Sequence, residues 1–471
     1  MVKQGTARSL CDLPEELILE VLEHNIYRRQ DLASLSLTCK KVRRIIEPLL
    51  YRHVELRRGL LILPFLVRTL LIRPELGRLV NRLDVDGAGE TLSDAFELEH
   101  WSKAFNQPPP EGGKSPEVVL LESAYESRSE ASRFWTTLST FPRRHLLHYP
   151  MFNLLLFLLP QLDDLRLVSV PSCLIRYPGI RHRERYPEVF GQHAFNSVAK
   201  VAYRHCPSLA VGYSEPWASD IPNVKEISVD PESLPISYEP RLAFPLDNIQ
   251  RIQICHNYYE RRNVVSLIKQ CRNLRNLGIS FEFPWHFSNV GSETRVSRCI
   301  PLLVEALLDR ADTLEYLGLK FCSNSRIHFQ MKNEDMAPAI KSLGKLEKVQ
   351  KLEIPAWMFE LNIYSSPNPK DAVTAVVQSL LPASLENLVL NNVYVPDAKF
   401  GTALDMISSN ARDFWPRLKE IHITESAKEC PFKTESQFRA SGVGKLVERC
   451  LKDSGIMLSF ETPNRLVFHG S

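Results

Sequence analysis

Large apolar residues recur at helical spacing in the first segment of the chain, residues 10–54. Pro14 stands where a first helical residue is expected, since its missing N–H has no intrahelical role there. Glu15 and Glu16 follow in the predicted first turn, where negative charge suits a helix N-terminus. The apolar face of this first helix consists of Leu13, Leu17, Ile18, Val21 and Leu22.

Two further helices are predicted in the same segment. Asp31 is a suitable N-cap for a helix that carries Leu32 and Leu35 and ends near Cys39. The third helix places Pro48 near its end, and its apolar positions are Val42, Ile45, Ile46 and Leu49. So short a segment holds too little apolar surface to fold stably alone, which favours a docking module whose core a partner completes. An ordinary N-terminal helical cap, with its apolar stripe buried inside the protein, is the alternative.

The same residues carry a family resemblance. Leu13-Pro14-x-Glu16-Leu17, Asp31-Leu32-x-x-Leu35, Cys39-Lys40 and Leu50-Tyr51-Arg52 together resemble an F-box, as it occurs in large fungal protein families, although Val42 stands where many F-boxes carry an aromatic residue. The resemblance implies docking on the Skp-family adaptor of an SCF-type ubiquitin ligase, and through the adaptor on a cullin. The positions that it marks for folding or adaptor contact are Leu13, Pro14, Leu17, Ile18, Val21, Leu22, Leu32, Leu35 and Cys39.

Beyond residue 75 the spacing apolar-x-x-apolar-x-apolar recurs nine times. The last two apolar residues of each unit alternate as in a strand, and this is the core spacing of the leucine-rich repeat, which adds one parallel strand per unit. The units are Val80/Leu83/Val85, Leu162/Leu165/Leu167, Val224/Ile227/Val229, Ile249/Ile252/Ile254, Leu274/Leu277/Ile279, Leu314/Leu317/Leu319, Val349/Leu352/Ile354, Leu385/Leu388/Leu390 and Leu418/Ile421/Ile423.

Helices are predicted between these strands, because parallel neighbours need crossover connections. They cover Val264–Cys271, Pro301–Ala311, Ala372–Leu381 and Thr402–Ala411. The predicted fold class is therefore α/β: a three-helix F-box followed by an irregular leucine-rich-repeat solenoid with a curved parallel sheet. A doubly wound α/β domain is the alternative. The predicted divisions are an N-terminal tail (1–9), the helical module (10–54) and a degenerate repeat domain (55–471) with a disordered proline-rich loop near 106–117.

Composition narrows the possible partners. The formal net charge of +3 over 471 residues is too small to indicate nucleic-acid binding across the chain. The ten cysteines contain no C-x-x-C pair, and the apolar runs are shorter than the roughly 20 residues that span a bilayer. No secretory signal is visible at the N-terminus. We expect a reducing cytoplasmic or nuclear compartment, with no membrane, nucleic-acid or cofactor partner.

Catalytic motifs are not found. Gly444-Lys445 suggests a phosphate loop, but Leu446 follows where the motif needs Ser or Thr. His145 and His148 lack an accompanying H-E-x-x-H, and no G-x-S-x-G elbow occurs. The sequence therefore predicts a non-catalytic protein.

A substrate receptor would use the concave face of the predicted sheet, where strand residues between the buried leucines point outward. Acidic, basic and neutral residues mix along this face, which suits a protein partner. The candidates for binding an unidentified protein substrate are Asp84, Asp86, Arg166, Glu226, Arg251, Tyr316, Lys320, Lys351 and His422. A repeat scaffold acting outside any ligase is the first alternative function, and an α/β hydrolase with a deep pocket is the second.

Overall fold

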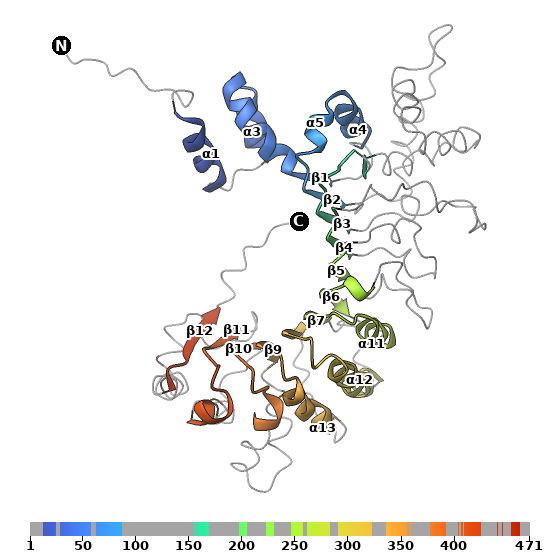
Figure 1. Cartoon of the computed structure of the whole chain (residues 1–471), viewed down its shortest axis with the longest axis vertical. Coiled ribbons are helices and arrows are strands. Elements are labelled where there is room, and N and C mark those ends of the chain that lie inside the picture. Colours follow the sequence, from blue (N-terminus) through green and yellow to red (C-terminus); the bar gives the residue numbers. More distant parts are fainter. Residues whose placement is uncertain are drawn as a thin grey trace, which may run out of the picture. The chain divides into compact units, whose positions relative to one another are not determined.

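The structure is a computed structural model of the chain (Figure 1). The predicted tail at 1–9 and the predicted loop near 106–117 lie outside the residues that it describes. Those residues are 13–24, 29–57, 63–86, 155–156, 158–168, 197–204, 223–229, 246–257, 261–282, 291–322, 336–355, 358, 377–391, 404, 407, 409–424, 440, 445 and 454–461.

The chain divides into two compact units, which are described separately. The first comprises residues 1–208 and 214–224, and the second comprises residues 209–213 and 225–471. The first unit begins with the three predicted helices, α1 (Glu15–His24), α2 (Arg29–Ser36) and α3 (Lys40–Arg52).

The helix ends differ from prediction by one to three residues. Pro14 lies just before α1, and its carbonyl oxygen accepts the first helical hydrogen bond from Ile18 N at 3.1 Å. Asp31 lies inside the first turn of α2 rather than at its N-cap, because α2 begins at Arg29. Cys39 is the N-cap of α3, where its Sγ accepts a hydrogen bond from Val42 N at 3.4 Å. Sequence patterns locate helices well and their terminal residues poorly.

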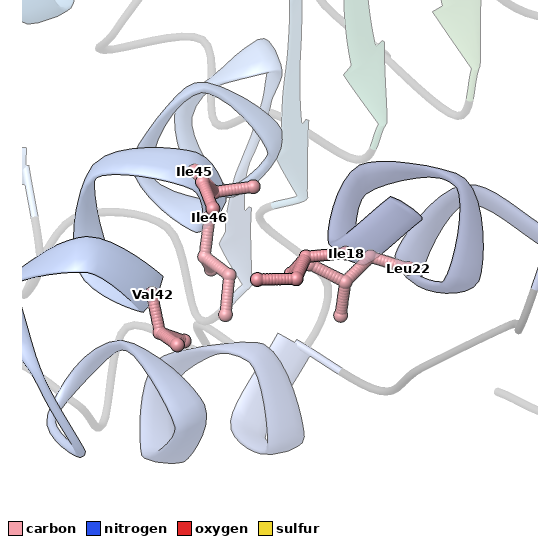
Figure 2. Packing of buried hydrophobic residues seen from close by; sticks show 5 residues of the cluster. All are labelled: Ile18, Leu22, Val42, Ile45 and Ile46. Atoms are coloured by element: carbon pink, nitrogen blue, oxygen red, sulfur yellow. The ribbon is translucent and has the colours of Figure 1, made fainter. Parts of the chain in front are cut away.

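The three helices share a small apolar core, shown in Figure 2. Side chains from α1 and α3 point toward one another there, and Ile18 and Ile46 are almost fully buried. Leu22, Val42 and Ile45 complete the cluster. The residues packed partly against it are Leu13, Leu32, Leu35, Cys39, Leu49 and Leu50.

The remainder of the first unit is a parallel sheet with short helices. Strand β1 (His53–Arg57) follows α3 without a linker, and β2 (Arg82–Asp86) pairs beside it. Strands β3 (Asp164–Val168) and β4 (Lys200–Arg204) extend the sheet in chain order, with every pairing parallel. Between β1 and β2 lie α4 (Leu63–Ile72) and α5 (Pro74–Gly77).

The second unit continues the same construction. Its described strands, all paired in parallel and in chain order, are β5 (Glu226–Val229), β6 (Arg251–Asn257), β7 (Asn276–Glu282), β8 (Tyr316–Cys322), β9 (Lys351–Pro355), β10 (Asn387–Asn391), β11 (Glu420–Thr424) and β12 (Met457–Glu461). The helical elements bounded within this unit are η7 (Leu246–Asn248), α11 (Arg261–Gln270), α12 (Gly291–Leu308), α13 (Met336–Lys341) and η8 (Ser342–Lys345). Successive helices α11, α12 and α13 pack against one another, alongside β7–β9 in Figure 1.

The apolar spacing explains the register of the paired strands in each unit. The second apolar residue of every predicted unit pairs with its counterpart in the next strand, as Leu277 pairs with Leu317 and Leu317 with Leu352. These three side chains are fully buried. The carbonyl oxygen of the residue just before a strand commonly accepts hydrogen bonds from two successive N–H groups at the start of the neighbouring strand. Gln250 O, just before β6, accepts from Arg275 N at 2.8 Å and from Asn276 N, the first residue of β7, at 2.9 Å. All nine predicted units lie at strands.

Three described strands were not predicted. The triplets Tyr51/Val54/Leu56 at β1 and Val198/Val201/Tyr203 at β4 fit the same spacing, but each contains a tyrosine where the predicted units have an aliphatic residue. At β12 the first apolar position is occupied by Gly455, whose φ of 74° lies in the left-handed region that glycine tolerates. The parallel ladder therefore accepts substitutions that a strict apolar template rejects.

The predicted crossover helices are present with shifted bounds. Helix α11 begins three residues before the predicted Val264, and α12 begins at Gly291, so that Pro301 is internal rather than initial. Residues 377–380 are helical within the predicted Ala372–Leu381, and residues 409–414 are helical from within the predicted Thr402–Ala411 to three residues beyond its end. Helix α13 was not predicted, since its six residues are too few to show a helical period. In the described part of the chain, no helix combines the length and apolarity needed to cross a bilayer.

Candidate functional site

Helix α1 presents two adjacent apolar stripes with different surroundings. Ile18 and Leu22 face the module's core and are 1% and 7% exposed. Leu17 and Val21 lie one position earlier, and their side chains remain 46% and 42% exposed. Exposed large aliphatic residues at i and i+4 on one helix form an apolar strip that solvent disfavours. We call Pro14, Leu17 and Val21 the α1 stripe.

The nine predicted adaptor residues thus separate into two groups. Leu17 and Val21 are exposed on α1, and Pro14 is exposed just before it. Ile18 and Leu22 are core residues. They can affect adaptor binding only indirectly, by holding α1 in place. The partly buried group, which packs against that core, consists of Leu13, Leu32, Leu35 and Cys39.

Two exposed apolar residues of this module were missed from the sequence. Leu37, in the turn between α2 and α3, is 83% exposed, the largest value among the exposed large apolar residues of the described chain. Leu19 on α1 is 36% exposed. Leu37 lies outside both helices and follows no helical period, so periodicity could not select it. The signal available was an apolar residue between the polar residues Ser36 and Thr38, just after the predicted apolar positions of the second helix.

Polar contacts tie the helices of the module together. Arg44 on α3 forms an ion pair and hydrogen bond with Glu15 at the start of α1. Lys41 Nζ donates to the carbonyl oxygen of Leu13 at 2.7 Å, across the same helix pair. These contacts fix α1 against α3 and thereby fix which of its sides is exposed.

A bidentate ion pair joins the module to the sheet that follows. Arg73, just before α5, donates from its two terminal nitrogens to both carboxylate oxygens of Glu47 on α3, at 2.6 and 2.9 Å. The hydrogen bond from Arg73 lowers the pKa of Glu47. Because α3 also runs directly into β1, the module and the first strands of this unit are held as one body.

The polar face of each sheet is the side opposite the buried leucines. In the first unit the charged residues of this face pair with one another: Arg82 donates to both carboxylate oxygens of Asp84 at 2.8 and 2.7 Å, and Arg166 Nη2 donates to Asp164 Oδ2 at 3.0 Å. Burial alone would raise the pKa of Asp84, but hydrogen bonds from His53 and Arg82 outweigh it and hold that pKa well below its usual range. Predicted substrate residues Asp84 and Arg166 are therefore engaged within the chain.

His53, Glu55 and Asp84 place one potential ligand atom each within 4.8 Å of the others. A divalent ion would need the Asp84 oxygens, yet both already accept hydrogen bonds from the Arg82 guanidinium. The fixed positive charge of Arg82 beside the group further disfavours a second cation. The chemistry of this cluster is that of an ion-pair network.

In the second unit the polar face centres on a buried carboxylate. Glu353 on β9 is 6% exposed; its Oε2 accepts from the Tyr316 hydroxyl at 2.9 Å, and its Oε1 lies 3.1 Å from Lys320 Nζ. Burial, reinforced by the neighbouring Glu353 charge, raises the pKa of Tyr316. Lys351 Nζ lies 5.7 Å from the centroid of the Tyr316 ring, in cation–π geometry. Three predicted substrate residues, Tyr316, Lys320 and Lys351, are thus brought together.

The other predicted substrate residues are placed apart from this group. Glu226 and Arg251 form an exposed ion pair of 3.5 Å between β5 and β6. Asp86 ends β2, and its side chain lies outside the described part of the structure. His422 on β11 contacts Ser459 Oγ through Nδ1 at 2.7 Å.

The His422 contact contains the residue types of a hydrolytic triad in the wrong order. Ser459 donates its hydroxyl proton to Glu420 Oε1 at 2.6 Å. The serine therefore stands between the carboxylate and the imidazole, whereas a nucleophilic serine gives its proton to a histidine that the carboxylate orients. This arrangement supports cross-strand pairing of β11 with β12.

Comparison with known protein families identifies the helical module. Residues 10–57 match the F-box-like family, which extends the predicted 10–54 segment through β1 to Arg57. No curated protein matches the chain. The matched residues include the α1 stripe and the turn that contains Leu37. The chain therefore contains an F-box-like domain at residues 10–57, which supports its assignment as an F-box protein.

Proposed function

We propose that this protein is a substrate-recognition subunit of an SCF-type ubiquitin ligase, in which α1–α3 bind a Skp-family adaptor and, through it, a cullin. The observation that carries the proposal is the α1 stripe: Leu17 and Val21 are exposed on a module whose sequence matches the F-box-like family. F-box domains typically bind such adaptors. In this proposal the protein itself is non-catalytic and acts in the cytoplasm, the nucleus or both.

The energetics of the stripe suit a moderate docking contact. Complete burial of a Leu or Val side chain contributes about 1.5–3 kcal/mol, so a side chain already half-buried in the free chain gains about half of that. Leu37, at 83% exposure, has the most still to gain. We assign Leu37, Leu17 and Val21 to direct contact, and Leu13, Leu32, Leu35 and Cys39 to the partly buried surface beside it.

The remaining chain is proposed to be a degenerate leucine-rich-repeat domain that holds a protein substrate. Its support is the one-strand-per-unit parallel pairing, with equivalent apolar residues such as Ile252, Leu277 and Leu317 in register. The receptor would act by proximity, because binding adaptor and target together raises the target's local concentration near the conjugating enzyme.

The decisive experiment compares two charged substitutions at equally exposed leucines. Leu17→Asp should abolish co-purification with a recombinant Skp-family adaptor, since a carboxylate would be buried without a partner. Leu302→Asp on α12, where the leucine is 44% exposed, is the matched control and should leave co-purification unchanged. Leu37→Asp should reproduce the Leu17→Asp loss. Adaptor binding retained in both module variants would refute the proposal.

A protein-binding scaffold working outside any ligase is the second candidate, favoured by the same sheet and independent of the α1 stripe. It predicts no adaptor in complexes isolated from cells and unchanged abundance of bound proteins after the Leu17→Asp substitution. Accumulation of those proteins would instead support the receptor function.

A further inference from the structure

Two glycines lie side by side on the polar face of the second unit. Gly278 on β7 pairs with Gly318 on β8, and both occupy the position between two buried apolar residues. A Cβ at Gly318 would lie 2.4 Å from the Tyr316 hydroxyl oxygen, and one at Gly278 would lie 2.1 Å from Gln253 Oε1. Because the two glycines have no side chains, the side chain of Gln253 can pack against the backbone at Gly278, and that of Tyr316 against the backbone at Gly318.

Tyr316 is held in this position by charged neighbours. Its hydroxyl donates to buried Glu353, and Lys320 saturates the second oxygen of that carboxylate. The side of the Tyr316 ring near its hydroxyl covers Gly318, and the residue remains only half-buried. The result is a planar, partly exposed aromatic surface fixed on the sheet, which needs no reordering before it contacts another molecule.

Cations surround this aromatic surface. Lys351 is exposed, and no carboxylate among the described residues lies within ion-pairing distance of its ammonium group. Arg251, 55% exposed, lies in the same row of paired strand positions as Asn276, Tyr316 and Lys351. Because Glu353 is buried and neutralised by Lys320, the charge that this area presents to solvent is positive. We call Arg251, Tyr316, Lys320 and Lys351 the Tyr316 patch.

The two units differ in how their polar faces use charge. In the first unit each arginine pairs with a carboxylate on its own strand: Arg82 pairs with Asp84 on β2, and Arg166 pairs with Asp164 on β3. Such pairs contribute little to binding, since a ligand would have to displace them. The Tyr316 patch instead leaves the Lys351 ammonium beside an aromatic ring, where an incoming carboxylate meets it without competition.

We propose that the Tyr316 patch binds an acidic segment of a protein, with an Asp or Glu carboxylate on Lys351 and apolar parts of the segment on the Tyr316 ring. Arg251, which is already paired with Glu226, adds positive charge beside them. This proposal deepens the proposed receptor function, on which it rests, by naming the substrate class. Two of the three cations of the Tyr316 patch are already paired, Arg251 with Glu226 and Lys320 with Glu353. The positive potential of the patch is therefore too weak for a polyanion and suits one or two carboxylates.

The test uses the full chain and synthetic peptides. An array of 12-residue peptides with Glu at four fixed positions and varied residues elsewhere is compared with a matched array that carries Gln at those positions. Binding to Glu peptides above their Gln counterparts is expected. The strongest Glu peptide is then labelled with fluorescein, and its dissociation constant is measured by anisotropy.

Charge reversal assigns the binding to the patch. Lys351→Glu should weaken the peptide at least tenfold. Lys348→Glu, the same charge change at an exposed residue before β9, should alter its affinity less than twofold. Arg251→Glu is the second patch variant and should also weaken binding, and circular dichroism checks that each variant is folded. Equal effects of Lys348→Glu and Lys351→Glu, or equal binding of Glu and Gln peptides, would overturn the proposal.

Other ligands and the adaptor complete the design. A phosphoserine peptide or an oligouridylate that binds through Lys351 more tightly than every Glu peptide would overturn the assignment to carboxylates. Adaptor co-purification is measured on the same variants and should be unaffected by Lys351→Glu. If the wild-type protein binds the peptide but not the adaptor, the ligase function alone is refuted. If it binds the adaptor but not the Glu peptides, only the proposal for the Tyr316 patch is refuted.

Discussion

Asn391 on β10 donates a hydrogen bond from its side-chain Nδ2 to the carbonyl oxygen of Leu319 on β8, 3.3 Å away and two strands distant. The strand between them, β9, ends at Pro355, which pairs with Asn391 in register. In this ladder Lys351 N donates to Glu315 O, and by the same two-residue step the donor for Leu319 O would be residue 355. Proline has no N–H, so the Asn391 side chain takes over that role.

Removing the Asn391 amide should therefore destabilise the protein more than its size suggests. Asn391 is 7% exposed, and Asn391→Ala leaves a buried carbonyl without its donor, at a cost of about 1–3 kcal/mol. Urea unfolding measures the change. Asn387→Ala, on the same strand but half-buried, is the control and should cost less than about 0.5 kcal/mol.

A second substitution isolates the mechanism. Pro355→Ala supplies a backbone N–H that can donate to Leu319 O. In that background Asn391→Ala should cost less than it does in the wild type, and the difference is the coupling between the two positions. Equal costs in both backgrounds would show that Asn391 stabilises β10 in another way.

The two stripes of α1 should separate folding from binding. Ile18→Ala removes a side chain that is 1% exposed and should cost about 2–5 kcal/mol within the module. Leu17→Ala should leave stability nearly unchanged while weakening adaptor binding. Hydrogen exchange of α1 and α3 amides reports stability, and calorimetric titration with the adaptor reports affinity. Faster exchange in the Leu17→Ala protein would contradict this division.

The Arg73–Glu47 pair should stabilise the protein in a pH-dependent way. Its pKa shift is downward at Glu47, so the contribution is present above the unfolded-state value of 4.5 and is lost as pH falls through the lower folded-state pKa. Arg73→Gln should cost about 1 kcal/mol at pH 7, since both side chains are partly exposed. The stability difference from wild type should hold between pH 7 and 5 and narrow below pH 4.5.

Chemical denaturation across this pH range checks the Arg73 prediction. Arg43→Gln is the matched control, because Arg43 lies 3.8 Å from Glu47 at a more exposed position and should contribute less than about 0.5 kcal/mol. A difference between wild type and Arg73→Gln that grows as pH falls would contradict the assignment to Glu47.

Local spacing was sufficient to locate most of the regular elements that the structure describes. The triplet Leu274/Leu277/Ile279 indicates a strand because its side chains alternate within a few residues, and β7 lies there. The three N-terminal helices follow for the same reason, since helix periodicity and capping depend on neighbours in the chain. Even there, β4 was not predicted, because Tyr203 pairs in register with Leu167 where the apolar template has an aliphatic residue.

Tertiary structure decided what the side chains on these elements do. Leu17 and Ile18 are chemically similar neighbours in the chain, and only the packing of α1 against α3 determines that one is exposed and the other buried. The polar strand residues likewise gain their roles from neighbours brought next to them by strand pairing, as Tyr316 gains Glu353 from β9. Periodicity acts within one element, whereas exposure and charge pairing depend on contacts between residues far apart in the chain.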